Sequence, residues 1–147
     1  MGADGGKLLA DAIKAHPNYT QIAMNMFDGK ADVDMSNKGL DAGDAFIIAA
    51  ALEKNDQVQQ LHAQNNGLGP EGAKSFRNML EDNSTLTLLD VSGNNMGPKG
   101  AAALADGLKS NSTVQQLDVS ANSLGPKGGK AIAAFIAENS TITSVSQ

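Results

Sequence analysis

The chain has 147 residues, a formal net charge of −5 and no cysteine. An acidic chain is a poor partner for the phosphate backbone of a nucleic acid, and without cysteine neither a disulfide framework nor a thiolate metal site can form. No apolar run approaches the ~20 residues that span a bilayer, and residues 1–6 lack the basic and apolar parts of a signal peptide, so we expect a cytoplasmic protein that does not enter a membrane.

Residues 1–32 are expected to form an N-terminal cap. Apolar residues recur at helical spacing over residues 5–16, which predicts a helix that ends before Pro17. Two alternating apolar runs then flank Asp28 and Gly29, a turn pair typical of a β-hairpin, so an antiparallel hairpin is predicted over residues 19–35. A helix over residues 19–27 is the alternative, because the apolar residues there also fit a period of 3.6.

From residue 33 onward the sequence repeats with a constant period of 28. Residues 58–68, 86–96 and 114–124 each match the pattern L-x-x-L-x-L-x-x-N-x-L. Apolar residues two apart place one face of a short strand in the core, and this holds for Leu61 and Ala63, Leu89 and Val91, and Leu117 and Val119. The asparagine of each stretch can satisfy backbone groups of neighbouring coils, so Asn66, Asn94 and Asn122 are expected to stack as a ladder.

Each stretch leads into a Gly-Pro-x-Gly turn and a helical segment. The turns lie at residues 69–72, 97–100 and 125–128, where glycine allows a tight bend and proline suits the first turn of a helix. Apolar stripes that should face the strands follow at Phe76, Met79 and Leu80, at Leu104 and Leu108, and at Ile132, Phe135 and Ile136. A last strand begins near Ile142, which makes about four repeats over residues 33–147, the last one incomplete.

These motifs resemble leucine-rich repeats of the ribonuclease-inhibitor type, the class also found in NOD-like receptors. Two positions depart from the pattern: Lys38 stands at the ladder position of the first repeat, and Ala63 is small where leucine is usual. The resemblance implies an α/β fold, a right-handed solenoid or horseshoe segment with a parallel sheet on its concave face and helices on its convex face. It also implies a protein-binding role, with specificity set by the variable strand positions.

Those variable positions are the candidate partner-binding residues. They are Asp34, Ser36, Gln60, His62, Gln64, Leu88, Asp90, Ser92, Gln116, Asp118 and Ser120. The resulting face is polar and mildly acidic, and Leu88 is its one sizeable apolar group, so a basic protein partner is favoured. Tryptophan is absent and tyrosine occurs once, although both are common in binding hot spots. The alternative is therefore a structural or self-associating scaffold, joined through its C-terminal edge, or a segment of a larger repeat protein.

No enzyme, cofactor or metal is expected. His62 should lie between Asp34 and Asp90 on the concave face, but an acid–base or zinc site needs more converging ligands. The glycine-rich turns lack the G-x-x-x-x-G-K-[ST] pattern of a phosphate loop. Residues 28–34 resemble a calcium loop only superficially, because Lys30 stands at a ligand position.

Overall fold

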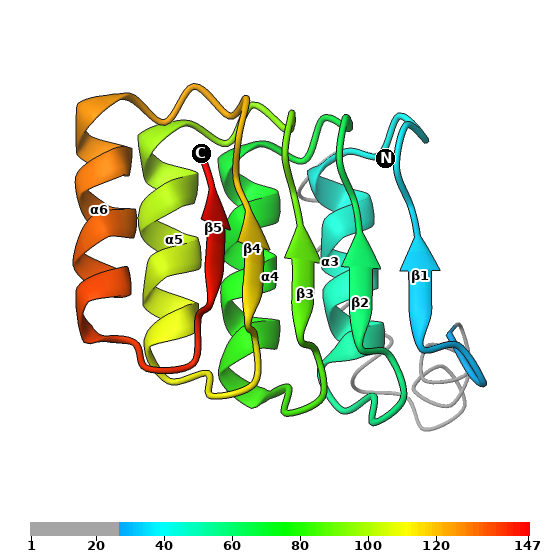
Figure 1. Cartoon of the computed structure of the whole chain (residues 1–147). Helices are drawn as coiled ribbons and strands as arrows, with labels where there is room; N and C mark the ends of the chain where they lie inside the picture. The colour runs from blue at the N-terminus through cyan, green and yellow to red at the C-terminus, as the bar shows by residue number, and fades with distance from the viewer. Residues whose placement is uncertain (1–26) are drawn as a thin grey trace.

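The computed structural model describes residues 27–147, in which a parallel sheet and a layer of helices wind into a solenoid (Figure 1). The five strands lie in chain order and are β1 (Asp32–Asp34), β2 (Gln60–His62), β3 (Leu88–Asp90), β4 (Gln116–Asp118) and β5 (Ser144–Ser146). The helices between them are α3 (Ala42–Leu52), α4 (Gly69–Asp82), α5 (Gly97–Lys109) and α6 (Gly125–Glu138). Each of the strands β1–β4 is followed by a helix that lies behind the sheet and then by the next strand. Each of these connections is a right-handed crossover. The predicted α/β solenoid is confirmed.

The repeat period fixes the register of the sheet. Val33, Leu61, Leu89, Leu117 and Val145 lie side by side, each paired with the residue one period away. The first four of these side chains are 0–4% exposed and form the row of the core nearest the sheet. Because side chains alternate along a strand, the residues before and after each of them face the concave side.

Helix starts follow the sequence motifs closely. Gly69, Gly97 and Gly125 adopt φ values of 61–63°, where an L residue is strained, and a proline follows each of them in the first helical turn. Helix α3 lacks this motif and begins instead with a capping box. There Asp41 accepts hydrogen bonds from the backbone of Gly43 and Asp44, and the Asp44 side chain accepts one from the backbone of Asp41.

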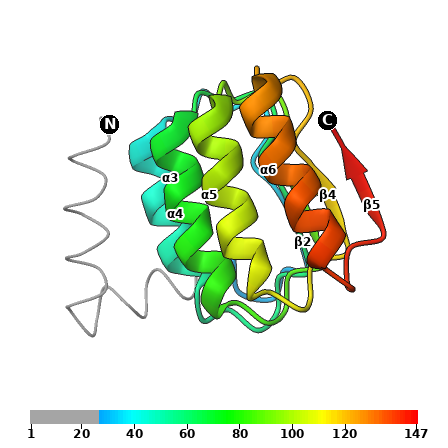
Figure 2. The same cartoon turned by 90° about the vertical axis from the view of Figure 1, so that its left-hand side faces the viewer.

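The convex helices pack side by side at short range (Figure 2). Gly107 on α5 faces the backbone of Arg77 on α4, and a Cβ atom added at Gly107 would lie 2.7 Å from the carbonyl oxygen of Arg77. Phe76, Met79 and Leu80 are buried as predicted. Ile136 is the exception to the predicted stripes: it is 37% exposed, because among the described residues no coil follows α6 to cover it.

The predicted asparagine ladder joins successive coils at the strand-to-helix corners. The side-chain amide nitrogen of Asn94 donates to the carbonyl oxygens of Ala63, Val91 and Ser92 at 2.9–3.0 Å. The amide oxygen of Asn122 accepts from the backbone N–H groups of Asn94 and Met96 at 2.9 and 3.2 Å. Buried backbone groups of a loop are thus paired by the next coil.

A second ladder, which we did not predict, runs along the helix-to-strand corners. The amide nitrogen of Asn111 donates to the carbonyl oxygens of Leu80 and Asn83 in the preceding coil, both at 3.0 Å. Its amide oxygen accepts from the backbone of Thr113 and Val114, which shapes the turn into β4. Asn83 makes the equivalent bonds one coil earlier.

The predictions for the N-terminal cap fall mostly outside the described residues. Both the helix over residues 5–16 and the first strand of the hairpin, with its helical alternative over 19–27, lie in that part of the chain. Within the described part, a turn covers residues 27–29, and β1 then pairs in parallel with β2.

Candidate functional site

The concave face carries three parallel rows of side chains, one residue from each coil. The first row holds Asp32, Gln60, Leu88, Gln116 and Ser144, and the second holds Asp34, His62, Asp90, Asp118 and Ser146. The third row follows the strand ends and holds Ser36, Gln64, Ser92 and Ser120. The structure therefore brings all eleven candidate residues onto one surface, which we call the concave face.

The aspartates of the second row are held by the serines of the third. The Oδ1 atom of Asp90 accepts hydrogen bonds from the backbone N–H and the hydroxyl of Ser92 at 3.0 and 2.8 Å. Asp118 and Ser120 repeat this arrangement, with distances of 2.9 and 2.7 Å. Each carboxylate is fixed in orientation and keeps its second oxygen available to an incoming donor.

At the first coil the same clamp changes the acidity of the carboxyl group. The Ser36 hydroxyl and backbone N–H donate to Asp34 Oδ1 at 2.6 and 2.9 Å. These bonds, that of the hydroxyl first, hold the pKa of Asp34 below its usual range because they stabilise the charged form. An ionised Asp34 is therefore favoured under all ordinary conditions.

His62 interrupts the row of aspartates. Its Nε2 atom lies 3.5 Å from Asp32 Oδ1, and its side chain is 28% exposed. Gln64 occupies the third-row position that is serine in the other three coils, and its side-chain oxygen is buried without a hydrogen-bond partner. In the described part of the chain, no three or more histidine, aspartate or glutamate side chains are grouped so as to hold a metal ion.

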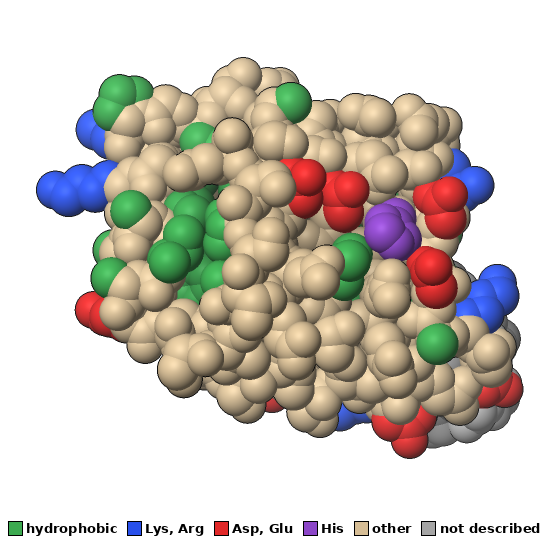
Figure 3. Space-filling model, in the orientation of Figure 1, with side chains coloured by type: hydrophobic (Ala, Val, Ile, Leu, Met, Phe, Trp, Pro, Cys, Tyr) green, Lys and Arg blue, Asp and Glu red, His purple; other side chains and the backbone are tan. Residues whose placement is uncertain are grey.

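A hollow of about 160 Å³ opens in the concave face over β2–β5. Its walls include Leu88, Asp90, Gln116 and Asp118, and Ser144 and Ser146 close it at the last strand. Figure 3 shows the carboxylates and the histidine gathered over the strands, with apolar atoms next to them. Leu88 is half-buried, so the hollow has an apolar wall beside two fixed carboxylates.

Asp32, which precedes Val33 and was expected on the same face, lies in the first row beside Gln60. Two residues of this site were not predicted: Ser144 and Ser146. Both occupy rows already identified, because they lie one repeat period from Gln116 and Asp118. Extending the period by one coil toward the C-terminus would have found them.

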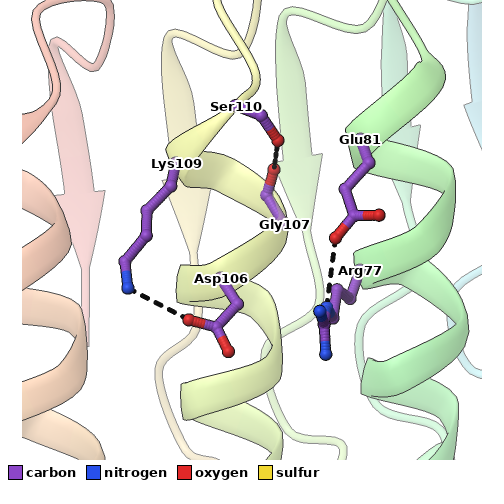
Figure 4. A network of polar contacts seen from close by, with 6 residues as sticks. All are labelled: Arg77, Glu81, Asp106, Gly107, Lys109 and Ser110. Carbon is purple, nitrogen blue, oxygen red and sulfur yellow. Dashed lines mark hydrogen bonds and ion pairs between the residues drawn. The ribbon is translucent and has the colours of Figure 1, made fainter.

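The convex face has a different electrostatic character. Arg77 pairs with Glu81 at 3.1 Å on α4, and Lys109 pairs with Asp106 at 3.1 Å on α5 (Figure 4). Both pairs link neighbouring turns of one helix and are about half exposed, so each contributes little to stability. These four side chains thus have partners of opposite sign, whereas Asp34, Asp90 and Asp118 of the concave face are held by neutral serines.

No helix among residues 27–147 has the length and apolar character needed to cross a membrane.

The chain is similar in sequence to one protein family and in fold to solved structures of other proteins. The family described as Leucine Rich repeat matches residues 82–105 and 110–133. No curated protein matches the chain. Among solved structures, Leiomodin-1 Actin-Binding Site 2 superposes with a TM-score of 0.77 at 24% identity, and the match covers 86% of this chain and 75% of that one. The tropomodulin C-terminal domain of Caenorhabditis elegans superposes with a TM-score of 0.75 at 16% identity, covering 86% and 81%.

Proposed function

We propose that this chain, whose sequence matches a leucine-rich-repeat family and whose fold is a leucine-rich-repeat solenoid, is a non-catalytic module that binds another protein through its concave face. The observation that carries this proposal is the hollow beside Leu88, where an apolar wall adjoins the carboxylates of Asp90 and Asp118. A protein hot spot commonly combines apolar contact with charge-assisted hydrogen bonds in one partly desolvated place.

The partner's chemistry follows from the clamped aspartates. Each uses one carboxylate oxygen for its serine, and the other can accept from a lysine ammonium or an arginine guanidinium. Since the serines already fix the carboxylates, binding would lose little side-chain entropy at these positions. We therefore propose a partner that presents a basic segment, with an apolar group placed against Leu88.

In another protein, a protein-binding site lies on the same fold. The leiomodin-1 structure is that of an actin-binding site, so a solenoid of this shape serves protein recognition in that molecule. This likeness lends support to the class of function proposed for this chain. The identity of the partner is proposed here only by its chemistry.

The proposal is tested by capturing partners on two variants with the same change in net charge. The first carries Leu88→Arg, Asp90→Arg and Asp118→Arg on the concave face. The control carries Ala102→Arg, Glu81→Arg and Asp106→Arg on the convex helices, where all three native side chains are exposed. Wild type and both variants, each shown to be folded by circular dichroism, are incubated with native cell extract, and the captured proteins are identified by mass spectrometry.

We expect one or more proteins to be captured by the wild type and the convex control and lost from the concave variant. Binding of a purified captured protein should also weaken as salt rises, because the contact is largely electrostatic. Equal capture by all three baits would refute the concave-face proposal.

A further inference from the structure

Two aspartates of the second row lie side by side in the interior of the sheet (Figure 3). Asp90 on β3 is in register with Asp118 on β4, and adjacent strands of a sheet are about 4.8 Å apart. Strand β2 borders β3 and strand β5 borders β4, so neither aspartate lies on an edge strand. Like charges on directly opposite positions destabilise a sheet, so this pair costs the fold some stability.

No cation of the described chain compensates these two charges. Every carboxylate of helices α4 and α5 lies 2.6–3.4 Å from a lysine or arginine nitrogen: Glu71, Glu81, Asp82 and Asp106. Within residues 27–147, neither Asp90 nor Asp118 forms an ion pair. Their side chains accept only from Ser92 and Ser120, through Oδ1, so both Oδ2 atoms are open to a cation from another molecule.

The same two strands place an apolar side chain and an amide next to the carboxylates. Leu88 precedes Asp90 by two residues on β3 and is in register with Gln116 on β4. Residues two apart on a strand share a face of the sheet, with their Cα atoms about 6.6 Å apart. Leu88, Gln116 and both aspartates line the hollow of the concave face, which is therefore acidic at one end and partly apolar at the other.

Leu88 is the exception in its row. The other first-row residues are all polar: Asp32, Gln60, Gln116 and Ser144. The second row, in turn, has one pair of neighbouring aspartates, and Leu88 lies on the strand of one of them. The two departures from the repeat thus meet at a single place, which suits a ligand with both an aliphatic part and a cationic end.

An arginine side chain matches this combination. Its guanidinium has five N–H donors in a planar fork, so different donors can reach the Oδ2 atoms of two neighbouring carboxylates. Its aliphatic stem can lie on Leu88, and the side-chain oxygen of Gln116 can accept a further N–H. A lysine ammonium is a compact, strongly hydrated charge, so it gains less from an apolar wall and from several fixed acceptors.

From the uncompensated aspartates and the apolar wall beside them, we propose that Asp90 and Asp118 together bind one arginine side chain of the partner, with its stem against Leu88, in preference to lysine. This inference rests on the proposed function, because it names the side chain by which a basic partner enters the concave face. Methylation of that arginine keeps its charge but blocks donors of the fork, so it should weaken the complex.

Titration with single blocked amino acids tests the preference for arginine without the partner. The probes are the amides of Nα-acetyl-arginine, Nα-acetyl-lysine and Nα-acetyl-dimethylarginine, which carry the same charge. NMR spectra at low salt follow the methyl groups of Leu88 and the carboxyl groups of Asp90 and Asp118. We expect millimolar binding of the arginine probe and dissociation constants at least about tenfold higher for the other two. Equal binding of arginine and lysine, or no saturable shift with arginine, would overturn the proposal.

A charge-neutral variant tests whether one arginine contacts both carboxylates. Loss of the Asp90 charge weakens any cation at Asp118, whereas loss of a shared guanidinium contact affects arginine alone. In Asp90→Asn the ratio of arginine to lysine affinity at Asp118 should therefore fall close to one. Asp106→Asn on α5 removes the same charge from the convex face and should leave the ratio unchanged. A ratio that stays at the wild-type value in Asp90→Asn would exclude the shared contact.

Leu88→Gln tests the apolar contact with a residue that the fold accepts, because glutamine stands at the same position of the neighbouring coils. The arginine probe should bind several-fold more weakly to this variant, and the lysine probe should change less. Unchanged binding of arginine would refute the placement of its stem against Leu88.

The arginine inference and the proposed function fail on different observations. Equal capture of proteins by the concave and convex variants refutes binding through the concave face. Equal affinity for the arginine and lysine probes refutes the arginine site, even where the concave variant has lost its partner.

Discussion

Replacing Gly107 by alanine tests whether the convex helices approach as closely as the structure indicates. The added Cβ would lie 2.7 Å from the carbonyl oxygen and 2.8 Å from the Cα of Arg77, whereas ordinary contacts start at 3.4 Å. Helices α4 and α5 must therefore separate locally by about 0.7 Å, because the obstacle is backbone that cannot rotate away. Overpacking of this kind costs ~1–3 kcal/mol of folding free energy.

Gly129 on α6 supplies the matched control. It lies within a helix, as Gly107 does, but a Cβ there has no neighbouring atom within 4 Å. Alanine should gain ~1 kcal/mol of helix propensity at either position. The difference between the two variants therefore isolates the cost of the close approach, because the propensity gain is common to both.

Urea unfolding followed by far-ultraviolet circular dichroism measures both variants against the wild type. We expect Gly129→Ala to stabilise the fold by ~1 kcal/mol and Gly107→Ala to fall ~1–3 kcal/mol below it. The slope of unfolding free energy against urea should stay constant, which shows that the same cooperative unit unfolds. A Gly107→Ala variant as stable as Gly129→Ala would refute the close contact between α4 and α5.

Three further predictions concern the corners of the coils. Asn94→Ala should lower the free energy of unfolding by ~2–5 kcal/mol in urea titrations, because it leaves buried backbone groups unpaired; a loss below ~1 kcal/mol would contradict the ladder. Ala121→Gly should raise the thermal midpoint, since Ala121 has φ 53° and relief of this conformation gives ~1 kcal/mol; an unchanged or lower midpoint would argue against that strain. The pKa of Asp34 is lowered in the folded chain, so its carboxylate stabilises the fold at pH values above the pKa of the unfolded chain, and this stability is lost as pH falls through the pKa of the folded chain. Ser36→Ala should raise the pKa of Asp34 in the folded chain, as measured by a carboxyl NMR titration. An unchanged Asp34 titration would show that the Ser36 clamp is not the cause.

Much of the fold could be predicted because the repeat period determines it. A constant spacing between repeats fixes which strand residues adjoin, so the row from Val33 to Val145 follows from the sequence alone. The ladder of Asn66, Asn94 and Asn122 was predicted for the same reason, since each asparagine closes an identical motif.

The features that escaped prediction depend on neighbours rather than on local pattern. Asn83 and Asn111 lie just after α4 and α5, and nothing in the local sequence shows that they bond to the preceding coil. Helical spacing placed Ile136 in an apolar stripe, but whether that stripe is covered depends on the next coil. The clamp of Asp90 by Ser92 was also missed, because the two residues were assigned to separate rows.

The asparagine ladders have a consequence for how such a protein can grow. Their bonds between coils join residues that are 26, 28 or 31 positions apart. Duplication or loss of one whole repeat unit therefore gives every remaining ladder residue an equivalent partner, whereas any other change in length removes several partners at once. Evolution can thus lengthen the concave face one coil at a time without changing the geometry of the coils already present.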